Sequence, residues 1–385
     1  MRTLLFTALL AASALAGCKW GEFDDLADTT WVHAADDPNI GSTNYAVAIV
    51  GVTTQSTGGQ IAVVSNDVPN YSTLDYGADG QATVGPNNQK LGVHFIASLS
   101  DPVILVTDGN GKVALVERAI DAGNIAVVTG PATAVADKPF ASVNTPDAAT
   151  FAGSSLVIAA GPTLYTQGDT GIPPACTSTD STFKVAGMAS DGTNVFVWTT
   201  MGQFGSIPVA ALSPCTGGNL PALGSTFTTT GFMPAVGSQV HFVLARYAVL
   251  VGHGPTPSSS GQIVVVDTTN MQQVGTTITI TDGLKSSAFG GYGGGSYLAV
   301  GIPTRSVDGL MSAGQVELYE MAPSTGILNT SPALALNDAQ PEAGQEFGHT
   351  VTTMKFNGKE ILVVGAHSEV FSYYKTALYD ALPPQ

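Results

Sequence analysis

The stretch Phe289–Tyr319 reads FGGYGGGSYLAVGIPTRSVDGLMSAGQVELY. A wholly apolar run, Tyr297–Ile302, lies between a glycine-rich turn and a polar loop, and Gly314–Tyr319 then alternates polar with apolar residues. Short apolar or alternating runs bounded by turn residues are typical of β-strands. The stretch therefore predicts three strands of one antiparallel sheet: an opening strand at Phe289-Gly290, an apolar strand and an alternating strand.

Imperfect copies of this unit recur along the chain. They lie near residues 45–64, 92–128, 151–165, 183–209, 240–266, 289–319 and 347–374. Each interval has room for one four-stranded unit of roughly 40–50 residues. The sequence therefore predicts a seven-bladed β-propeller of four-stranded antiparallel blades over residues 29–382. We expect Gly92–Phe95 to open the second blade, and Thr29–Ala34 to close the ring against the last blade, whose final strand is expected at Thr376–Tyr379.

Composition supports an all-β fold class. Of the 385 residues only 11% are charged, whereas 44% are hydrophobic and 45 are glycine. Long helices usually carry Glu, Lys, Arg and Gln on their wet faces, and here Thr, Ser, Gly and Asn take those positions. The formal net charge of −16 argues against a nucleic-acid partner, because phosphate binding needs a basic surface. Solubility is the simpler explanation of the negative charge.

The copies resemble the FG-GAP repeats of integrin α-subunit propellers and their bacterial relatives. Phe289-Gly290 and Phe347-Gly348 resemble the Phe-Gly element, and Val300–Pro303, Val364–Ala366 and Ala160–Pro162 resemble the Gly-Ala-Pro element. That family often holds calcium in an aspartate-rich loop between the first two strands of a blade. No copy here supplies three oxygen ligands at such a spacing, so we expect neither calcium nor another cofactor.

The N-terminus has the features of a targeting signal. Arg2 precedes an apolar run, Leu4–Leu15, of the length of a signal-peptide core. Leu15–Cys18 resembles the lipobox of bacterial lipoproteins, in which the signal is cut before the cysteine and the cysteine is acylated. The resemblance implies that residues 1–17 are a signal peptide and that Cys18 anchors the chain to a lipid bilayer. Residues 18–28 would be an acidic tether.

The resemblance also implies a location. In some bacteria an aspartate after the acylated cysteine retains a lipoprotein at the inner membrane, so Lys19 favours the outer membrane, with a periplasmic or surface-exposed domain. An ordinary secreted protein, cut after an Ala-x-Ala-like site, remains the alternative. Cys176 and Cys215 are the only pair left once Cys18 carries lipid. A disulfide is the natural expectation outside the cytoplasm, and two free thiols are the alternative.

No catalytic signature is present, since the chain lacks a Gly-x-Ser-x-Gly elbow, a Walker loop and a His-Glu-x-x-His motif. His94, His241 and His349 recur on expected opening strands. Three imidazoles lining a channel could bind a metal, but hydrogen-bond capping of each blade is the simpler interpretation, and we assign no metal site. Glu317 and Glu369 are candidate carboxylates, but no partner can be assigned to either from their spacing.

Loops that join the second and third strands should all emerge on one face, where binding sites usually lie. The candidate binding residues on that face are His253, Arg305, Asp308 and His367. We therefore expect a non-catalytic binding or adhesion module for an unknown protein or glycan. A structural docking component of an envelope assembly is the first alternative, and a hydrolase or lyase with a site at the channel mouth is the second.

Overall fold

A computed structural model gives the arrangement of strands between residues 19 and 374, and side chains for residues between 147 and 366. The described residues are 19–23, 29–36, 46–54, 58–65, 73–74, 81–84, 89–92, 103–107, 112–117, 123–129, 136–140, 147–153, 155–167, 175–212, 215–256, 259–291, 295–338, 341–356, 359–366 and 370–374.

Apart from two short 3₁₀ helices, all the regular secondary structure of the described residues is β-strand, which confirms the all-β class. The first four-stranded sheet contains β2 (Thr29–Asp36), β3 (Ala46–Thr54), β4 (Gly58–Ser65) and β5 (Thr73–Leu74). The second contains β8 (Val103–Thr107), β9 (Lys112–Glu117), β10 (Gly123–Thr129) and β11 (Ala136–Phe140). Between them β6 (Gln81–Val84) and β7 (Gln89–Gly92) form a separate two-stranded sheet.

The central part of the chain repeats the same order. The third sheet contains β12 (Ala148–Ala152), β13 (Ser155–Ala160), β14 (Thr163–Gln167) and β15 (Ala175–Thr177). The fourth contains β16 (Val185–Ser190), β17 (Asn194–Thr199), β18 (Gln203–Pro208) and β19 (Thr226–Thr228), and two short 3₁₀ helices, η1 (Val209–Ala211) and η2 (Thr216–Gly218), lie between β18 and β19. The fifth contains β20 (Gln239–Val243), β21 (Tyr247–Gly252), β22 (Gly261–Asp267) and β23 (Gln272–Ile280).

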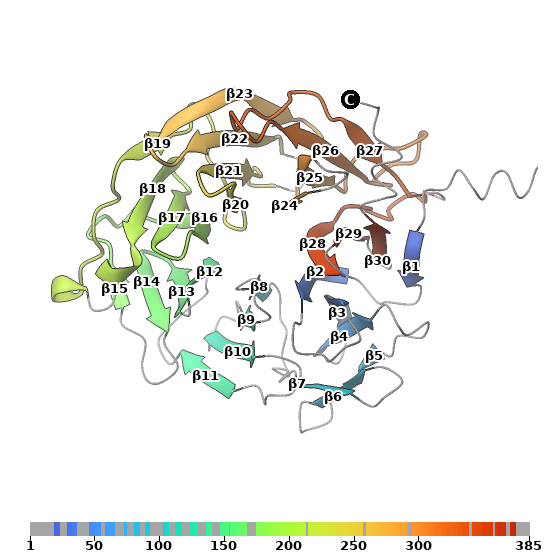
Figure 1. Cartoon of the computed structure of the whole chain (residues 1–385), viewed down its shortest axis with the longest axis horizontal. Helices are drawn as coiled ribbons and strands as arrows, with labels where there is room; N and C mark the ends of the chain where they lie inside the picture. Colours follow the sequence, from blue (N-terminus) through green and yellow to red (C-terminus); the bar gives the residue numbers. More distant parts are fainter. Residues whose placement is uncertain are drawn as a thin grey trace, which may run out of the picture.

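Two further four-stranded sheets follow in the described part of the chain. The sixth contains β24 (Ser286–Gly290), β25 (Ser296–Ile302), β26 (Gln315–Met321) and β27 (Leu334–Leu336). The last sheet joins β28 (Thr350–Phe356), β29 (Lys359–Gly365) and β30 (Val370–Tyr374) to β1 (Lys19–Phe23) from the other end of the chain. The first strands of the sheets contact one another in the cyclic order β2, β8, β12, β16, β20, β24, β28 and back to β2. Figure 1 shows the sheets radiating around a centre, as in a β-propeller.

The core is divided among the spaces between neighbouring sheets. In β25, Leu298, Val300 and Ile302 pack towards the fifth sheet, whereas Tyr297 and Ala299 pack towards the last sheet. Successive side chains of a strand point to opposite faces, so a strand covered on both faces must be apolar at every position. Each fully buried Leu, Ile or Val stabilises the fold by about 1.5–3 kcal/mol. This explains why apolar runs mark the second strands in the sequence.

The second sheet differs from its expected alignment. Its innermost strand is β8 (Val103–Thr107), which contacts β2 and β12 of the neighbouring sheets, so this apolar run is a first strand instead of the expected second strand. Gly92 belongs to β7, which pairs with β6, and His94 lies outside the described residues. An apolar run indicates burial on both faces, and a first strand between two neighbouring sheets meets that condition as well as a second strand does.

Ring closure also differs from the expectation. Residues 29–34 lie in β2, which pairs with β3 in the first sheet, and the outer strand of the last sheet is β1, within the segment expected to be a tether. The physical reason is that β30 would otherwise leave an unpaired edge, and the preceding segment can cover it. The expected final strand at 376–379 lies outside the described residues.

The two Phe-Gly pairs do not occupy equivalent positions. Ser286 lies opposite Gly301 in the sixth sheet, and Thr350 lies opposite Gly365 in the last sheet. By this register Phe289-Gly290 ends its first strand, whereas Phe347-Gly348 precedes its first strand. Gly301 and Gly365 are equivalent, since each lies opposite the first residue of the preceding strand. A Cβ atom at Gly301 would lie 1.9 Å from the carbonyl oxygen of Gly348, so close packing requires glycine there.

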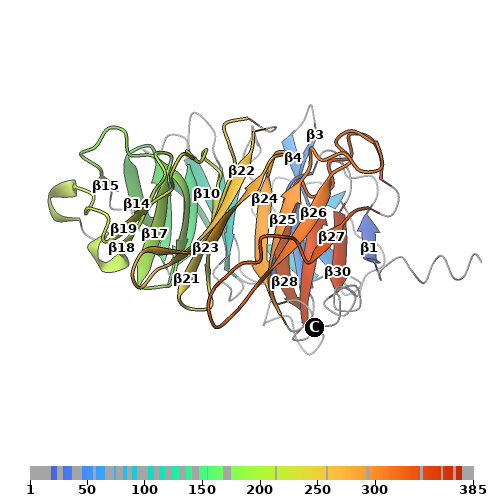
Figure 2. The same ribbon diagram turned by 90° about the horizontal axis from the view of Figure 1, so that it is seen from above.

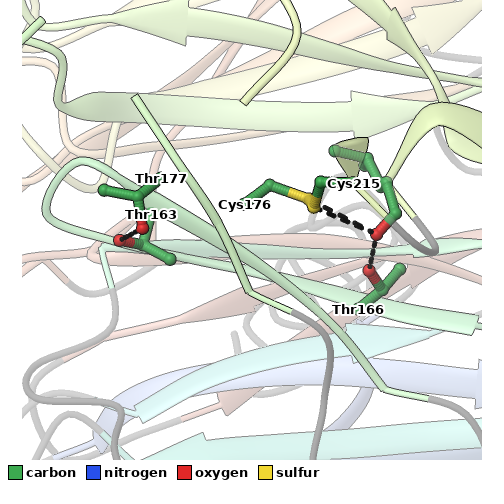
Figure 3. The surroundings of a disulfide bond; sticks show 6 residues. Thr163, Thr166, Cys176, Thr177 and Cys215 are labelled. Atoms are coloured by element: carbon green, nitrogen blue, oxygen red, sulfur yellow. Dashed lines mark hydrogen bonds between the residues drawn. A yellow bond between two sulfur atoms is a disulfide. The ribbon is translucent and has the colours of Figure 1, made fainter. Parts of the chain in front are cut away.

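The expected disulfide is present between Cys176 and Cys215, which are separated by 39 residues. It joins β15 of the third sheet to the segment just after η1 of the fourth sheet, and Figure 3 shows its surroundings. The hydroxyl group of Thr166 donates a hydrogen bond of 2.9 Å to the carbonyl oxygen of Leu212 beside it. On the chain-entropy model a loop of this length contributes about 3–4 kcal/mol to stability. Among the described residues, no helix has the length and apolarity to cross a bilayer.

Candidate functional site

The strands run between two faces of the molecule, which Figure 2 shows edge-on. We call the face at which second strands end and third strands begin the loop face. It carries residues 303–314 between β25 and β26, residues 253–260 between β21 and β22, and residues 337–349 between β27 and β28. The opposite face carries the turns from first to second strands and from third to fourth strands.

The 303–314 loop contains its own small hairpin. The backbone N–H of Val307 donates to the carbonyl oxygen of Leu310 at 3.1 Å, and the N–H of Leu310 donates to the carbonyl oxygen of Val307 at 2.9 Å. Asp308 and Gly309 form the tip with φ values of 52° and 83°. Positive φ at both central residues is the geometry of a type I′ turn, which Asp-Gly favours. The tip therefore has a defined shape.

The base of this loop is fixed to the next sheet. The backbone N–H groups of Gly344, Glu346 and Phe347 donate to the carbonyl oxygens of Met311, Ser312 and Ala313, each at 2.9 Å. Gly314 has a φ of 86°, and a Cβ atom there would lie 2.2 Å from the carbonyl oxygen of Phe347. Residues 311–314 and 344–347 thus interlock across the junction between the sixth and last sheets.

Arg305 fastens the other side of the loop, so it is not free for a ligand. Its Nε and Nη2 atoms each lie 2.9 Å from Oδ2 of Asp282, in the segment before β24. Its Nη1 atom donates to Oε1 of Gln315 at 2.7 Å and also pairs with Oε1 of Glu317. The sequence assigned no partner to Glu317, yet this carboxylate accepts from both Arg305 and the Tyr319 hydroxyl group.

Burial and charge act together in this cluster, which we call the Arg305 cluster (Arg305, Asp282, Gln315, Glu317 and Tyr319). Burial alone would lower the pKa of Arg305, but the nearby Glu317 carboxylate and Asp282 raise that pKa above its ordinary value. Burial, followed by the hydrogen bond to Glu317, raises the pKa of Tyr319. The arginine therefore stays charged and the tyrosine stays protonated at any ordinary pH. The cluster therefore holds the 303–314 loop in place on the loop face.

Ser306, Asp308 and Met311 are the side chains of the 303–314 loop that are exposed to solvent. Asp308 is exposed, and the Met311 side chain is 75% exposed. Met201 and Met233 are also exposed on the loop face, at 53% and 65%, whereas Met271 between β22 and β23 is buried. Methionine is flexible and polarisable and is common on surfaces that adapt to partners. An exposed apolar side chain on a fixed loop is available to contact a ligand.

The histidine candidates have different surroundings. His253 lies against the preceding connection, where its backbone N–H donates to the hydroxyl oxygen of Ser238 at 3.3 Å and its carbonyl oxygen accepts from Ala235. Its Nδ1 atom lies 2.9 Å from the carbonyl oxygen of Gly254. His253 therefore helps to join the fourth and fifth sheets. His367 lies outside the described residues, as does Cys18.

The histidines that were expected on opening strands are not equivalent. His241 lies on β20, and its Nε2 atom is 2.7 Å from the hydroxyl oxygen of Ser287 on the neighbouring β24. Ser287 in turn donates to Oε1 of Gln239 at 2.6 Å, so its proton is already engaged. Burial lowers the pKa of His241 to about 4. His349 instead precedes β28 and lies 2.8 Å from a carboxylate oxygen of Glu346.

No group of three or more His, Cys, Asp or Glu side chains is placed to hold a metal ion in the part of the chain whose side chains are described. Asp282 and Glu346 were missed in the sequence because their partners come from distant or irregular segments. Asp282 precedes β24 and Arg305 follows the neighbouring strand β25, 23 residues later in the sequence, and no local spacing marks that pair. Glu346 has a φ of 56°, within a connection that no periodic pattern describes.

Comparisons with known proteins bear on the fold. No family model matches the chain, and no curated protein matches it in sequence. Among solved structures, it is similar to a chain in the "Crystal Structure of Mitotic Checkpoint Complex", with a TM-score of 0.53 and 11% sequence identity. The match covers 93% of this chain and 94% of that one. At this identity the likeness concerns the fold alone, and it agrees with a propeller-like arrangement of four-stranded sheets.

Proposed function

We propose that the chain is a non-catalytic binding or adhesion module of a bacterial cell envelope, which contacts a protein or glycan through its loop face. The observation that carries this proposal is the 303–314 loop. It is fixed on one side by the Arg305 cluster and on the other by residues 344–347, and it presents Asp308 and Met311 to solvent. A loop ordered before binding loses little conformational entropy when a ligand arrives.

The proposal includes a ring of seven blades of the FG-GAP type. The cyclic contacts of the seven first strands support seven blades. The FG-GAP resemblance is supported by Gly301 and Gly365, which occupy the same register position near the ends of the apolar strands of two sheets. The non-equivalent Phe-Gly pairs do not support it, so the resemblance rests on the glycines and on the order of apolar and alternating strands.

The proposal also includes a lipid anchor at Cys18, after removal of residues 1–17, and a location at the outer membrane. The lipobox-like Leu15–Cys18 and the following Lys19 support it. The Cys176–Cys215 disulfide supports an oxidising compartment outside the cytoplasm. Replacing Cys18 with Ala is expected to move the protein from the membrane fraction to the soluble fraction, and continued membrane association would contradict the anchor.

Binding is tested with the purified chain on immobilised extracellular-matrix proteins and on a glycan array. We expect saturable binding, reduced at least ten-fold by Asp308→Asn combined with Met311→Ala. Asparagine tolerates the positive φ at the tip, so the turn should persist. Ile327→Ala is the matched control, because Ile327 is 45% exposed but lies on the opposite face. No saturable binding, or equal loss in the control, would contradict the proposal.

An envelope docking component is the alternative outcome of the same experiments. Such a protein would bind neither matrix nor glycan but would retain specific protein partners after crosslinking in intact cells. Loss of those partners in the Asp308→Asn/Met311→Ala variant would still assign the loop face as the contact surface.

A further inference from the structure

The direction of β1 determines where the chain before it leaves the last sheet. β29 ends at the loop face, because its Gly365 carbonyl oxygen accepts a hydrogen bond from Gly348 in the 337–349 connection. β30 therefore starts at the loop face and ends at the opposite face. β1 is antiparallel to β30, with Lys19 opposite Tyr373 and Phe23 opposite Val370. Lys19 thus lies at the opposite face.

The proposed acylation site is therefore next to the opposite face. Cys18 immediately precedes Lys19, and the Cα atoms of consecutive residues are about 3.8 Å apart. Since β1 begins at Lys19, no tether separates the anchor from the sheet. The side of the molecule where β1 begins must then lie close to any membrane that holds the lipid.

The charged residues of the last sheet are divided between its two ends, with lysines at the opposite face and acidic residues at the loop face. Lys355 lies near the end of β28 and Lys359 begins β29, both at the opposite face, together with Glu360, which lies opposite Lys355. With Lys19 they place three lysines and one glutamate at that end. The loop-face end of the same sheet carries acidic residues, on β1 and in the connection that leads into β28: Glu22, Glu342 and Glu346. One sheet therefore has a basic end beside the anchor and an acidic end away from it.

We propose that the opposite-face end of the last sheet lies on an anionic lipid bilayer, so that the loop face points away from the membrane. The inference rests on the proposed lipid anchor. Each lysine near an anionic surface raises partitioning about five-fold. In the reversed orientation the acidic end would lie at the surface and be repelled by it. The seven residues of β29 span about 20 Å, which exceeds the Debye length of about 8 Å at physiological salt. The membrane field therefore does not reach Met311 or Asp308.

Orientation is measured on the acylated protein in vesicles of phosphatidylcholine and phosphatidylglycerol. Ile327→Cys and Met311→Cys give a matched pair of labelling positions in the sixth sheet, exposed at 45% and 75% on opposite faces. A fluorophore at residue 327 should be quenched by a quencher carried on lipid headgroups, whereas one at residue 311 should not. Equal quenching, or stronger quenching at residue 311, would overturn the orientation.

The contribution of charge is measured on the non-acylated Cys18→Ser protein. We expect binding to phosphatidylglycerol vesicles, no binding to phosphatidylcholine vesicles, and at least a ten-fold loss with Lys355→Glu plus Lys359→Glu. Lys285→Glu reverses one exposed charge at the loop face, so it is compared with Lys359→Glu alone and should leave binding unchanged. Equal loss with Lys285→Glu and Lys359→Glu, or no binding of the Cys18→Ser protein to anionic vesicles, would overturn the docking surface.

Failure of the anchor and failure of the orientation are distinguishable. If Cys18→Ala stays in membranes, the proposed anchor is wrong. If Cys18→Ala is released but the label at residue 311 lies nearer the lipid, the anchor stands and the orientation is wrong.

Discussion

The guanidinium group of Arg305 lies at the surface loop where a ligand contact was expected, but its acceptors belong to the protein. Its side chain is 22% exposed, and that of its partner Glu317 is only 8% exposed. Removing one member of such a pair leaves a largely buried charge without compensation, which typically costs 3–5 kcal/mol. Removing both charges avoids that penalty.

The ion pair of Arg305 and Glu317 should be measurable in thermal denaturation. Arg305→Met should lower the unfolding free energy by about 3 kcal/mol. Arg305→Met combined with Glu317→Gln should lower it less, because the introduced amide can still accept from the Tyr319 hydroxyl group and leaves no buried charge. Lys285→Met is the control, since Lys285 is exposed on the same face, and should change the midpoint little. Additive losses in the double variant would show that Glu317 is stabilised by something other than Arg305.

His241 predicts a pH dependence of stability. Burial lowers its pKa in the folded protein to about 4, whereas an unfolded histidine titrates near 6.5. As the pH falls from 6.5 towards 4, the unfolded chain takes up a proton that the folded protein does not, so stability decreases across that interval and levels off below it. His241→Gln keeps a donor for Ser287 and should lack this component. Denaturant midpoints of the two proteins between pH 4 and 8 measure it, and parallel curves would contradict it.

Among the elements, the apolar second strands were predictable and the connections were not. The run Tyr297–Ile302 is apolar because the fifth and last sheets cover its two faces. Burial on both faces constrains every residue of the run, so the sequence shows it directly. The pairing of Cys176 with Cys215 followed from their loop contexts and from the removal of Cys18 from the count. These features depend on burial or on a small number of possible partners.

Other elements could not be predicted in this way. The run in β8 is as apolar as a second strand, but it is the first strand of its sheet, because it contacts β2 and β12 of the neighbouring sheets. These strands are far from β8 in the sequence. The partners of Arg305 are Asp282, Gln315 and Glu317, of which only the last two follow it in the same sheet. His241 and His349 share a sequence context but not a strand position. Long-range geometry decides each of these, and no local pattern records it.

For the molecule as a whole, the pairing of β1 with β30 is the decisive contact, because it joins the two ends of the chain in one sheet. Figure 1 shows both strands in the last sheet, next to the first sheet. A segment that was expected to be a tether therefore has a structural role. Without it, β30 would present unpaired backbone groups, and an exposed edge strand is a template for association with other chains.

Deleting residues 19–23 should therefore destabilise the ring, whereas a chain that begins at Lys19 should not differ in stability from one that begins at Cys18. We expect the deletion to lower the thermal midpoint and to cause concentration-dependent association in analytical ultracentrifugation. Hydrogen exchange gives the sharper measurement, because the amides of β30 should lose protection while those of β21 and β25, buried in other sheets, keep it. Unchanged protection of β30 would mean that its edge is covered by another segment and that β1 does not close the ring.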